Sequence, residues 1–294
     1  MFDNIEILNL KTAWREAAQL LKKIGIETPL LDARLLLQNT LNIKYEELIV
    51  SADRVLNGEE KQHLINFLKR RAKREPVSKI IGQKEFWGLS FITAKDNLDP
   101  RPDSETLIEA VIQNYTDNQR NLNILDLGTG SGCLLLTLLF LYPNAKGIGV
   151  DKSLEALKIA GENTKKHNLQ DRAEFFVSDW FSNIEGKFDI IICNPPYIKS
   201  EAINYLEPEV RFFDPKIALD GGADGLGCYR ELLAEIENYL ETHGKIFFEI
   251  GKWQEAPIVE MIEENGFEVL DIKQDLQAIP RVISFTKPYL KLVK

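Results

Sequence analysis

The sequence contains few of the residues that form disulfides or bind metal ions. Among its 294 residues are three cysteines and three histidines. Cys133, Cys193 and Cys228 are odd in number and lie far apart in the chain, so we expect small buried thiols in a reducing compartment. Because no Cys/His cluster has the spacing of a metal site, we expect no metal ion. These features predict a cytoplasmic protein.

Long apolar segments are also scarce. The longest strongly apolar run, Cys133 to Tyr142, is about half of the roughly 20 residues that a membrane span needs. The start, Met1-Phe2-Asp3-Asn4, lacks the basic region and apolar stretch of a secretory signal. With 44% hydrophobic and 28% charged residues, the composition is that of a soluble globular protein. The length suits one large domain or two ordinary ones, and no membrane contact is expected.

The net charge of −9 is unevenly distributed along the chain. Residues 1–85 contain 15 Lys and Arg against 12 Asp and Glu, which gives +3, and residues 86–294 contain 21 against 33, which gives −12. Because an acidic surface repels a phosphate backbone, we expect no direct DNA binding by the larger part. The basic run Lys69–Arg74 could face a nucleic acid or an acidic protein, although a solvated helix end is the more ordinary interpretation.

Residues 1–84 are predicted to form a small all-α bundle, which has the look of a docking surface for a protein. A first helix is indicated by apolar residues at helical spacing between positions 14 and 24. Thr28 suits the N-cap of a second helix that begins at Pro29, and a third helix follows Asn57. No alternation of the strand type interrupts this region.

The pattern then changes to short β-rich pieces around a turn, and residues 85–96 are predicted to be a β-hairpin linker. Over residues 97–294, strands and helices alternate, which is typical of an α/β, doubly wound, mostly parallel sheet with helices on both faces. The last two strands have a short connection, so we expect them to be antiparallel neighbours. The expected strands are 123–127, 146–151, 173–178, 188–193, 245–250, 267–272 and 281–286, and the expected helices are 131–141, 154–167, 229–242 and 254–265.

Three consecutive strands of this predicted sheet end in residues that suit a nucleoside. The second ends in Asp151, whose carboxylate could accept hydrogen bonds from both ribose hydroxyls. The third is followed by Asp179 and Trp180, an acid and a flat aromatic for the edge and face of adenine, although Trp180 could equally be a packing residue. The first leads into a tight turn before a helix, formed by Gly128, Thr129, Gly130, Ser131 and Gly132.

The spacing of the glycines favours one class of nucleoside cofactor. Gly-x-Gly-x-Gly differs from the Gly-x-Gly-x-x-Gly of dinucleotide sites, which bind a pyrophosphate at the helix N-terminus. S-adenosylmethionine has no phosphate, so the same N-terminus need satisfy only its methionine carboxylate. We therefore expect S-adenosylmethionine as the cofactor, and a nicotinamide oxidoreductase is the weakest alternative.

The fourth strand leads into Asn194-Pro195-Pro196-Tyr197, which suits an NH2 group. Two prolines make the corner stiff, and the Asn194 side chain and the Pro195 carbonyl offer two acceptors aimed at one point. With both hydrogens bound, the nitrogen lone pair can face the methyl group, while Tyr197 stacks on the flat group that carries the nitrogen. The sulfonium is already reactive, so in-line positioning rather than a strong base is needed.

Further segments make the chain similar, over essentially its whole length, to a known family. They are Gly25–Leu36, Pro100–Thr106, Glu209-Val210, Phe213, Asp220–Leu226, Tyr229-Arg230 and Ile279–Val282. With these and the two motifs above, the sequence resembles the bacterial peptide chain release factor glutamine methyltransferases. That resemblance implies the class I methyltransferase fold, with seven strands and an antiparallel last strand. It also implies methylation of the glutamine in the Gly-Gly-Gln loop of class 1 release factors, with S-adenosylhomocysteine as the product.

The resemblance also implies roles for individual residues. The Gly128–Gly132 turn, Asp151, Trp180 and Asn194 would contact the cofactor, Asn194–Tyr197 would hold the glutamine amide, and Arg101 would lie near the substrate entrance. One departure is visible, because Lys252-Trp253-Gln254 follows Gly251 where similar proteins often carry a Tyr-Asp-Gln-like segment.

The Asn-Pro-Pro-Tyr motif alone leaves other functions open. An adenine-N6 DNA methyltransferase also methylates a flat NH2 group, but it must extract its base and usually carries a basic DNA-gripping domain. Methylation of a ribosomal protein glutamine is a close alternative. A docking protein that binds the cofactor without using it is a third, although the intact motif argues against it.

Overall fold

The computed structural model describes residues 9–95 and 97–288, which form two compact units. The first unit contains the N-terminal helices together with Glu207–Phe213, and the second contains Lys84–Leu206 and the chain from Asp214 onward. Nothing in the sequence indicated that Glu207–Phe213 would group with the helices. The division into domains at 1–84, 85–96 and 97–294 stays a prediction.

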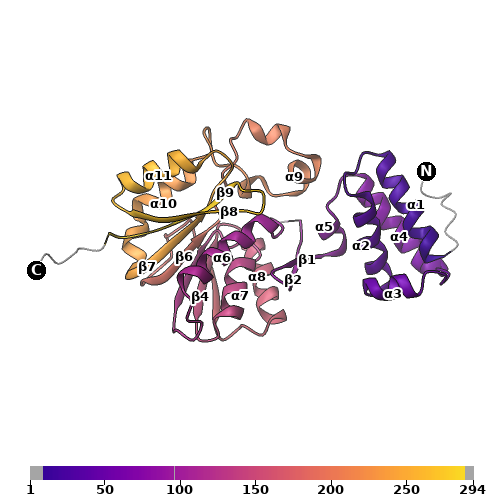
Figure 1. Cartoon of the computed structure of the whole chain (residues 1–294), viewed down its shortest axis with the longest axis horizontal. Helices are drawn as coiled ribbons and strands as arrows, with labels where there is room; N and C mark the ends of the chain where they lie inside the picture. Colours follow the sequence, from indigo (N-terminus) through magenta and orange to yellow (C-terminus); the bar gives the residue numbers. More distant parts are fainter. Residues whose placement is uncertain (1–8, 96, 289–294) are drawn as a thin grey trace, which may run out of the picture. The chain divides into compact units, whose positions relative to one another are not determined.

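The first unit is a helical bundle whose helix starts are defined by capping residues. Asn9 and Asn57 each form a reciprocal capping box, at the starts of α1 and α4. Thr28 takes the predicted N-cap position before Pro29, but its hydroxyl donates to the Asp32 carboxylate, 2.8 Å away. The helices are α1 (Leu10–Lys23), α2 (Pro29–Leu41), α3 (Tyr45–Val50), α4 (Gly58–Ala72), α5 (Val77–Ile81) and α9 (Pro208–Phe213) (Figure 1).

One apolar core holds α1 to α5 together. Fully buried side chains such as Leu21, Leu36 and Leu64 come from α1, α2 and α4, the three helices that the sequence predicted. Burial of one such side chain contributes about 2 kcal/mol. The short helices α3 and α5 were not predicted, because six and five residues are too few to show a helical period.

The basic run at the end of α4 is largely neutralised within the first unit. Arg71 is buried, with Nε 2.6 Å from Asp32 Oδ2 and Nη1 2.8 Å from Glu209 Oε1. A solvated helix end is therefore the wrong description of this arginine. The neighbouring ion pairs are Arg70 with Glu75 and Arg74 with Glu209.

The second unit is built on a seven-stranded sheet with the order β5-β4-β3-β6-β7-β9-β8. The first five strands in this order are parallel, and β9, the last strand in the chain, runs antiparallel to both β7 and β8. The prediction of a mostly parallel sheet with an antiparallel last strand is confirmed. The strands are β3 (Asn123–Leu127), β4 (Lys146–Asp151), β5 (Ala173–Val177), β6 (Phe188–Cys193), β7 (Leu240–Glu249), β8 (Glu268–Gln274) and β9 (Pro280–Thr286).

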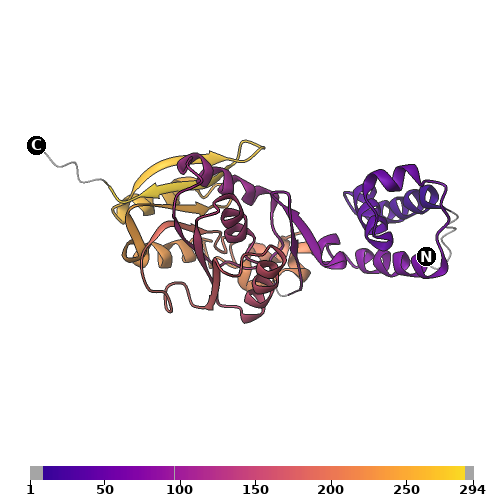
Figure 2. The same ribbon diagram turned by 90° about the horizontal axis from the view of Figure 1, so that it is seen from below.

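Helices cover both faces of this sheet (Figures 1 and 2). One face packs against α6 (Glu105–Asn114), α7 (Cys133–Leu141) and α8 (Leu154–Lys166), and the other against α10 (Gly227–Glu235) and α11 (Glu255–Glu264). No helix in the described part of the chain has both the length and the apolar character that a membrane crossing requires.

The predicted hairpin is present and belongs to the core of the second unit. Its strands are β1 (Gln83–Phe86) and β2 (Leu89–Ile92). Phe86 and Phe91 are buried among side chains of the sheet and its helices. The hairpin is therefore packed into the core of the second unit through these two side chains.

One expectation about the second unit was wrong, and one helix was missed. The helix expected over 229–242 ends at Glu235, and after a 3-10 turn β7 already begins at Leu240. Leu240 is fully buried and pairs with Phe188, so burial against the sheet decides its conformation. Helix α6 was not foreseen, although Leu107, Ile108 and Val111 lie at helical spacing.

Candidate active site

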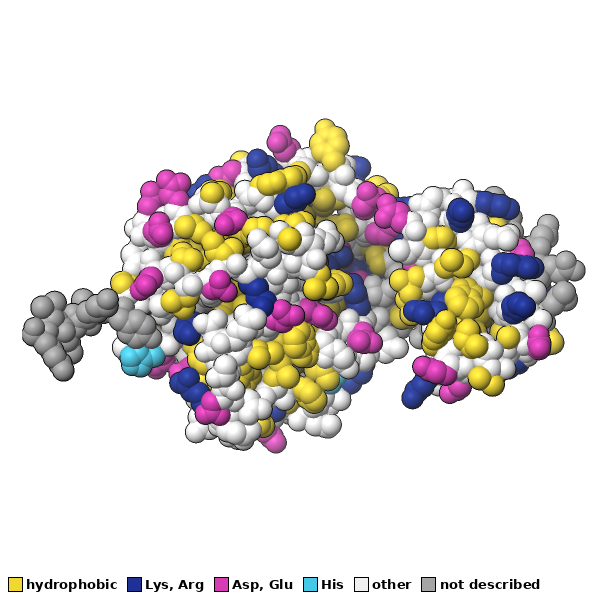
Figure 3. Space-filling model, viewed as in Figure 1, with side chains coloured by type: hydrophobic (Ala, Val, Ile, Leu, Met, Phe, Trp, Pro, Cys, Tyr) yellow, Lys and Arg dark blue, Asp and Glu magenta, His cyan; other side chains and the backbone are white. Residues whose placement is uncertain are grey.

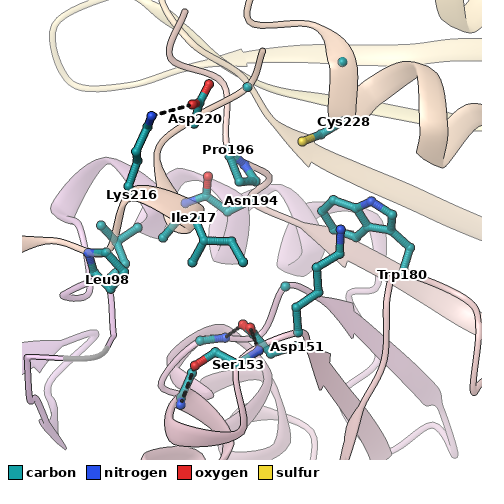
Figure 4. Close-up of a pocket in the computed structure, with 18 of the residues that line it drawn as sticks. Leu98, Asp151, Ser153, Trp180, Asn194, Pro196, Lys216, Ile217, Asp220 and Cys228 are labelled. Carbon is teal, nitrogen blue, oxygen red and sulfur yellow. Dashed lines mark hydrogen bonds and ion pairs between the residues drawn. The ribbon is translucent and has the colours of Figure 1, made fainter. Parts of the chain in front are cut away.

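The predicted site residues converge because they follow the carboxyl ends of adjacent parallel strands. Strands β4, β3 and β6 lie side by side and end at one edge of the sheet. A cavity of about 640 Å³ opens there, and its lining includes Gly128, Asp151, Trp180 and Asn194. Figure 4 shows Asp151 on one side of the cavity, Trp180 on a second, and Asn194 with Pro196 across from Asp151.

The glycine-rich turn presents its backbone to the cavity and turns its side chains away. Gly128, Gly130 and Gly132 have φ of +73°, +56° and +77°, a region that favours glycine. Gly128 and Gly130 line the cavity. Thr129 is buried and donates from Oγ1 to Asp126 Oδ2 at 2.6 Å, while Ser131 is also buried. A Cβ on Gly132 would lie 3.2 to 3.3 Å from side chains of α7, α8 and β5, so this glycine permits close packing of those elements.

Asp151 connects the turn to the end of β4. Its carboxylate accepts hydrogen bonds from the backbone amides of Gly130, at 3.0 Å, and Ser153, at 2.8 Å. Burial raises the pKa of Asp151, and these backbone hydrogen bonds oppose that rise. Ser153 in turn caps α8 by accepting from the Ala156 amide. The carboxylate is therefore held in place before any ligand binds.

Trp180 forms a flat wall beside the turn in a backbone conformation that is rare for its type. Its φ is +47°, and its ring lies 3.7 Å from the position that a Cβ on Gly128 would take. Its indole Nε1 donates to Glu231 Oε2 at 2.9 Å. Two residues that the sequence did not single out hold the Trp180 ring. They are Glu231 and Lys152, and Lys152 Nζ lies 5.9 Å from the ring centre.

Asp179 lies differently from its neighbour. Its carboxylate is 61% exposed and pairs with Lys152 Nζ at 2.8 Å. The side chain is thus engaged by a lysine that also lines the cavity. Its predicted contact with an adenine edge stays a prediction.

The Asn-Pro-Pro-Tyr corner is packed tightly from behind. Asn194 and Pro196 line the cavity, while Pro195 is buried. A Cβ on Gly225 would lie 2.5 Å from the Tyr197 carbonyl oxygen, and one on Gly221 would lie 2.7 Å from that of Pro196. Only glycine permits such close approach of the neighbouring loop, and the contact restricts movement of the motif.

Burial raises the pKa of the Tyr197 hydroxyl to about 12, and the Glu249 charge adds to the rise. Tyr197 is therefore a neutral, flat group at neutral pH and unsuited to act as a base.

Arg101, which was expected near a substrate entrance, forms an ion pair with Asp214, with Nη2 2.5 Å from Oδ2. This pair ties the segment before α6 to the loop that follows the motif.

Two buried carboxyls near the site were missed by the sequence analysis. Burial raises the pKa of Asp126, at the end of β3, to about 7, and that of Glu249, at the end of β7, also to about 7. The signal for Glu249 is a charged residue that directly follows the apolar run Ile246-Phe247-Phe248. A buried charge at a strand end beside a cavity is a common feature of functional sites.

Comparison with known proteins identifies the family. Residues 12–82 match the PrmC N-terminal domain, and residues 85–209 match the Methyltransferase small domain. A release factor glutamine methyltransferase of Caulobacter vibrioides is 40% identical and covers 94% of this chain and 96% of its own length. One of Rhodospirillum rubrum is 43% identical, with 92% and 81% covered. This chain belongs to the release factor glutamine methyltransferase family. The resemblance noted from the motifs is confirmed.

The fold of this family member is shared by a solved methyltransferase from Pyrococcus furiosus. The two have a TM-score of 0.52 and 22% identity, and the match covers 75% of this chain and 99% of the other. At that identity the likeness concerns the fold alone. It agrees with the strand order of the second unit, and the predicted class I methyltransferase fold is confirmed.

Proposed function

We propose that this methyltransferase transfers the methyl group of S-adenosylmethionine to the side-chain amide nitrogen of the Gly-Gly-Gln glutamine in class 1 release factors. The observation that carries the proposal is Asn194, which lines the cavity on the side opposite Asp151 (Figure 4). An amide acceptor facing a nucleoside-sized cavity suits an NH2 substrate. The reaction would take place in the cytoplasm and modulate translation termination.

The cavity fits S-adenosylmethionine in its donor and acceptor groups. Asp151 is an acceptor for ribose hydroxyls, Trp180 is a flat wall for adenine, and the backbone of Gly128 and Gly130 permits close approach. We assign Thr129, Ser131, Gly132 and Asp179 supporting roles around these contacts. When bound, the cofactor would supply a sulfonium-activated methyl group and leave as S-adenosylhomocysteine.

The protein's own residues would hold the substrate nitrogen. The Asn194 side-chain oxygen and the Pro195 carbonyl would each accept one N–H of the glutamine amide, which aims the nitrogen at the methyl group. Pro196 keeps the corner stiff, and Tyr197 would pack on the amide plane. After transfer the methylated nitrogen carries a positive charge and loses one of its two original protons, so no residue need act as a strong base before the methyl group moves.

The first unit is proposed to dock the release factor. It carries several large exposed apolar side chains, which Figure 3 shows as yellow groups on its surface. Exposed apolar clusters of this kind are typical of protein interaction sites. These side chains are Leu30, Leu31, Tyr45, Ile49, Val50 and Val55.

The decisive test uses the full chain, S-adenosylmethionine and a purified class 1 release factor. The mass of the tryptic Gly-Gly-Gln peptide should rise by one methyl group. No gain in mass would contradict the proposal. Parallel incubations with ribosomes and with DNA separate it from methylation of a ribosomal protein glutamine and from adenine-N6 methylation.

A further inference from the structure

The orientation of the Asn194 side-chain amide decides whether the proposed chemistry is possible. An asparagine has an acceptor oxygen on one side and an NH2 donor on the other. Only Oδ1 can accept a hydrogen bond from a substrate amide, and a flipped side chain would set one NH2 group against another. The residues that bind Nδ2 therefore decide whether Asn194 Oδ1 faces the substrate amide.

Two buried residues stand behind Asn194 in the second unit. Asn194 Nδ2 donates to Ser104 Oγ at 3.2 Å, whereas Oδ1 takes no hydrogen bond from the residues that the structure describes. Glu249 lies beside them because β6 and β7 pair in parallel with Cys193 opposite Phe248, so the next residue of each strand, Asn194 and Glu249, emerges side by side. Ser104 and Glu249 are 3% and 1% exposed.

The direction of the hydrogen bonds follows from the Ser104 hydroxyl, which has a single proton. Glu249 Oε2 is buried without a hydrogen-bond partner among the described residues, and an ionised carboxylate can only accept. We therefore expect the Ser104 proton to turn toward Glu249, which leaves the lone pairs of Ser104 Oγ for Asn194 Nδ2. Burial raises the pKa of Glu249, and hydrogen bonding from Ser104 and from Asn194 opposes that rise. When Glu249 is ionised, its carboxylate thus fixes the direction of the Ser104 O–H donor and, through it, of the Asn194 Nδ2 donor.

We propose that Ser104 and Glu249 are positioning residues that hold Asn194 with Nδ2 turned inward and Oδ1 turned toward the substrate amide. This inference rests on the proposed function, because it assumes an NH2 substrate. It assigns the two residues an action through Asn194 and no contact with the reacting atoms.

The arrangement of Glu249, Ser104 and Asn194, called the relay below, should respond to pH. Burial raises the pKa of Glu249 to about 7, and the opposing influences are hydrogen bonding from Ser104, the charge of Arg281 and hydrogen bonding from Asn194. The charge of Asp103 adds to the rise, and the buried Cys193 and the partly buried Tyr197 stay neutral with raised pKa values of their own. Once protonated, Glu249 can donate to Ser104 and the fixed direction is lost. Turnover should therefore fall as the pH drops through about 7.

The kinetic test compares Glu249→Gln, Ser104→Ala and Ser104→Thr with Glu268→Gln, a matched change at an exposed residue of β8. With a class 1 release factor as substrate, Glu249→Gln and Ser104→Ala should lower kcat by roughly 10- to 100-fold, with KM and the Kd for S-adenosylmethionine within about threefold of wild type. Glu249→Gln should also abolish the fall of kcat at low pH. Ser104→Thr keeps the hydroxyl and should restore most of the activity, and Glu268→Gln should behave as wild type.

A substrate-free measurement separates this inference from the proposed function. In protein labelled with 15N-asparagine, the Asn194 side-chain NH2 signals, assigned by their loss in Asn194→Ala, should shift with a midpoint near pH 7. That shift should vanish in Glu249→Gln and persist in Glu268→Gln. An Asn194 signal that ignores pH, or wild-type kcat in both Glu249→Gln and Ser104→Ala, would overturn the relay. If the shift is present but no release factor is methylated, the relay stands and the assigned substrate is wrong.

Discussion

The side chain of Gln254 donates from Nε2 to the carbonyl oxygen of Tyr197 at 3.0 Å. The same nitrogen donates to the Gly225 carbonyl at 3.1 Å, and Gln254 Oε1 accepts from the Gly251 amide at 2.9 Å. One amide thus joins the loop after β7, the end of the Asn-Pro-Pro-Tyr motif and the loop before α10. Within the segment Lys252-Trp253-Gln254, the glutamine shared with similar sequences makes these hydrogen bonds, whereas Trp253, which departs from them, is 85% exposed.

Gln254→Ala should loosen the motif. The substitution removes three hydrogen bonds and leaves two carbonyls and one amide without their partner, so we expect the free energy of unfolding to fall by about 1–3 kcal/mol. Because Tyr197 loses its support, KM for the release factor should rise and kcat should fall, while the Kd for S-adenosylmethionine changes little. Urea denaturation and steady-state kinetics measure these effects. Gln170→Ala, in an exposed turn, is the control. Equal stabilities and equal kinetic constants of the two variants would show that the hydrogen bonds of Gln254 are unimportant.

Asp151 and Asn194 should separate binding from turnover. Asp151→Ala removes a held acceptor for the ribose, so the Kd for S-adenosylmethionine should rise by about 10- to 100-fold. Asn194→Ala should leave that Kd within a modest factor and lower kcat by about 100- to 1000-fold, since it removes an acceptor aimed at the reacting nitrogen. Isothermal titration calorimetry and single-turnover rates measure the two quantities. Equal losses of cofactor affinity in both variants would contradict this division of roles.

Much of the second unit could be predicted from the sequence because its central strands, such as β3 and β6, are buried on both faces. Continuous apolar runs such as Ile190–Ile192 have few alternatives, and the predicted bounds of β3, β4 and β6 agree with the structure. The end of α10 could not be predicted in the same way. A helix and a strand are both compatible with the segment around Leu240, and only its pairing with Phe188 decides between them.

The candidate-site residues that directly follow a strand in the sequence could be predicted, whereas those brought close by the pairing of strands could not. Asp151, Trp180 and Asn194 each follow a strand, and parallel strands bring such residues to one edge. Ser104, Glu249 and Gln254 are remote in sequence from Asn194. Their contacts with the motif depend on the pairing of β6 with β7 and on the path of the loop before α6, which residue spacing does not encode.

Arg71 should be critical for the first unit. It is 7% exposed and bridges Asp32 on α2 and Glu209 on α9. Although burial alone would raise it, the hydrogen bonding and charge of Arg71 hold the pKa of Glu209 below its usual value. Arg71→Met leaves the buried Asp32 without its cation and Glu209 with Arg74 alone, so we expect a loss of about 3–5 kcal/mol in the free energy of unfolding at pH 7.

The loss in Arg71→Met should shrink as the pH falls. The folded-state pKa of Glu209 lies below its unfolded value of 4.5, so the pair stabilises wild type above that pH and less below it. Urea denaturation at pH 7 and pH 4 tests this. Arg15→Met is the matched control, because Arg15 is 65% exposed and its contact with Glu16 is 3.7 Å long. A difference between the two variants that is independent of pH would argue for lost packing instead of lost charge pairing.

Glu249→Gln should stabilise the protein at alkaline pH while it impairs turnover. The pKa of Glu249 is raised from 4.5 to about 7, so its carboxyl favours folding when protonated, and this contribution is lost as the pH rises through 7. The shift corresponds to about 3 kcal/mol. Glutamine cannot ionise, so the variant should exceed wild type by about 1–3 kcal/mol in the free energy of unfolding at pH 8, and this advantage should disappear by pH 5. Asp126 titrates in the same range in both proteins and cancels in their difference. Urea denaturation at the two pH values measures the effect. A variant that tracks wild type at both pH values would mean that Glu249 is not held as a buried charge.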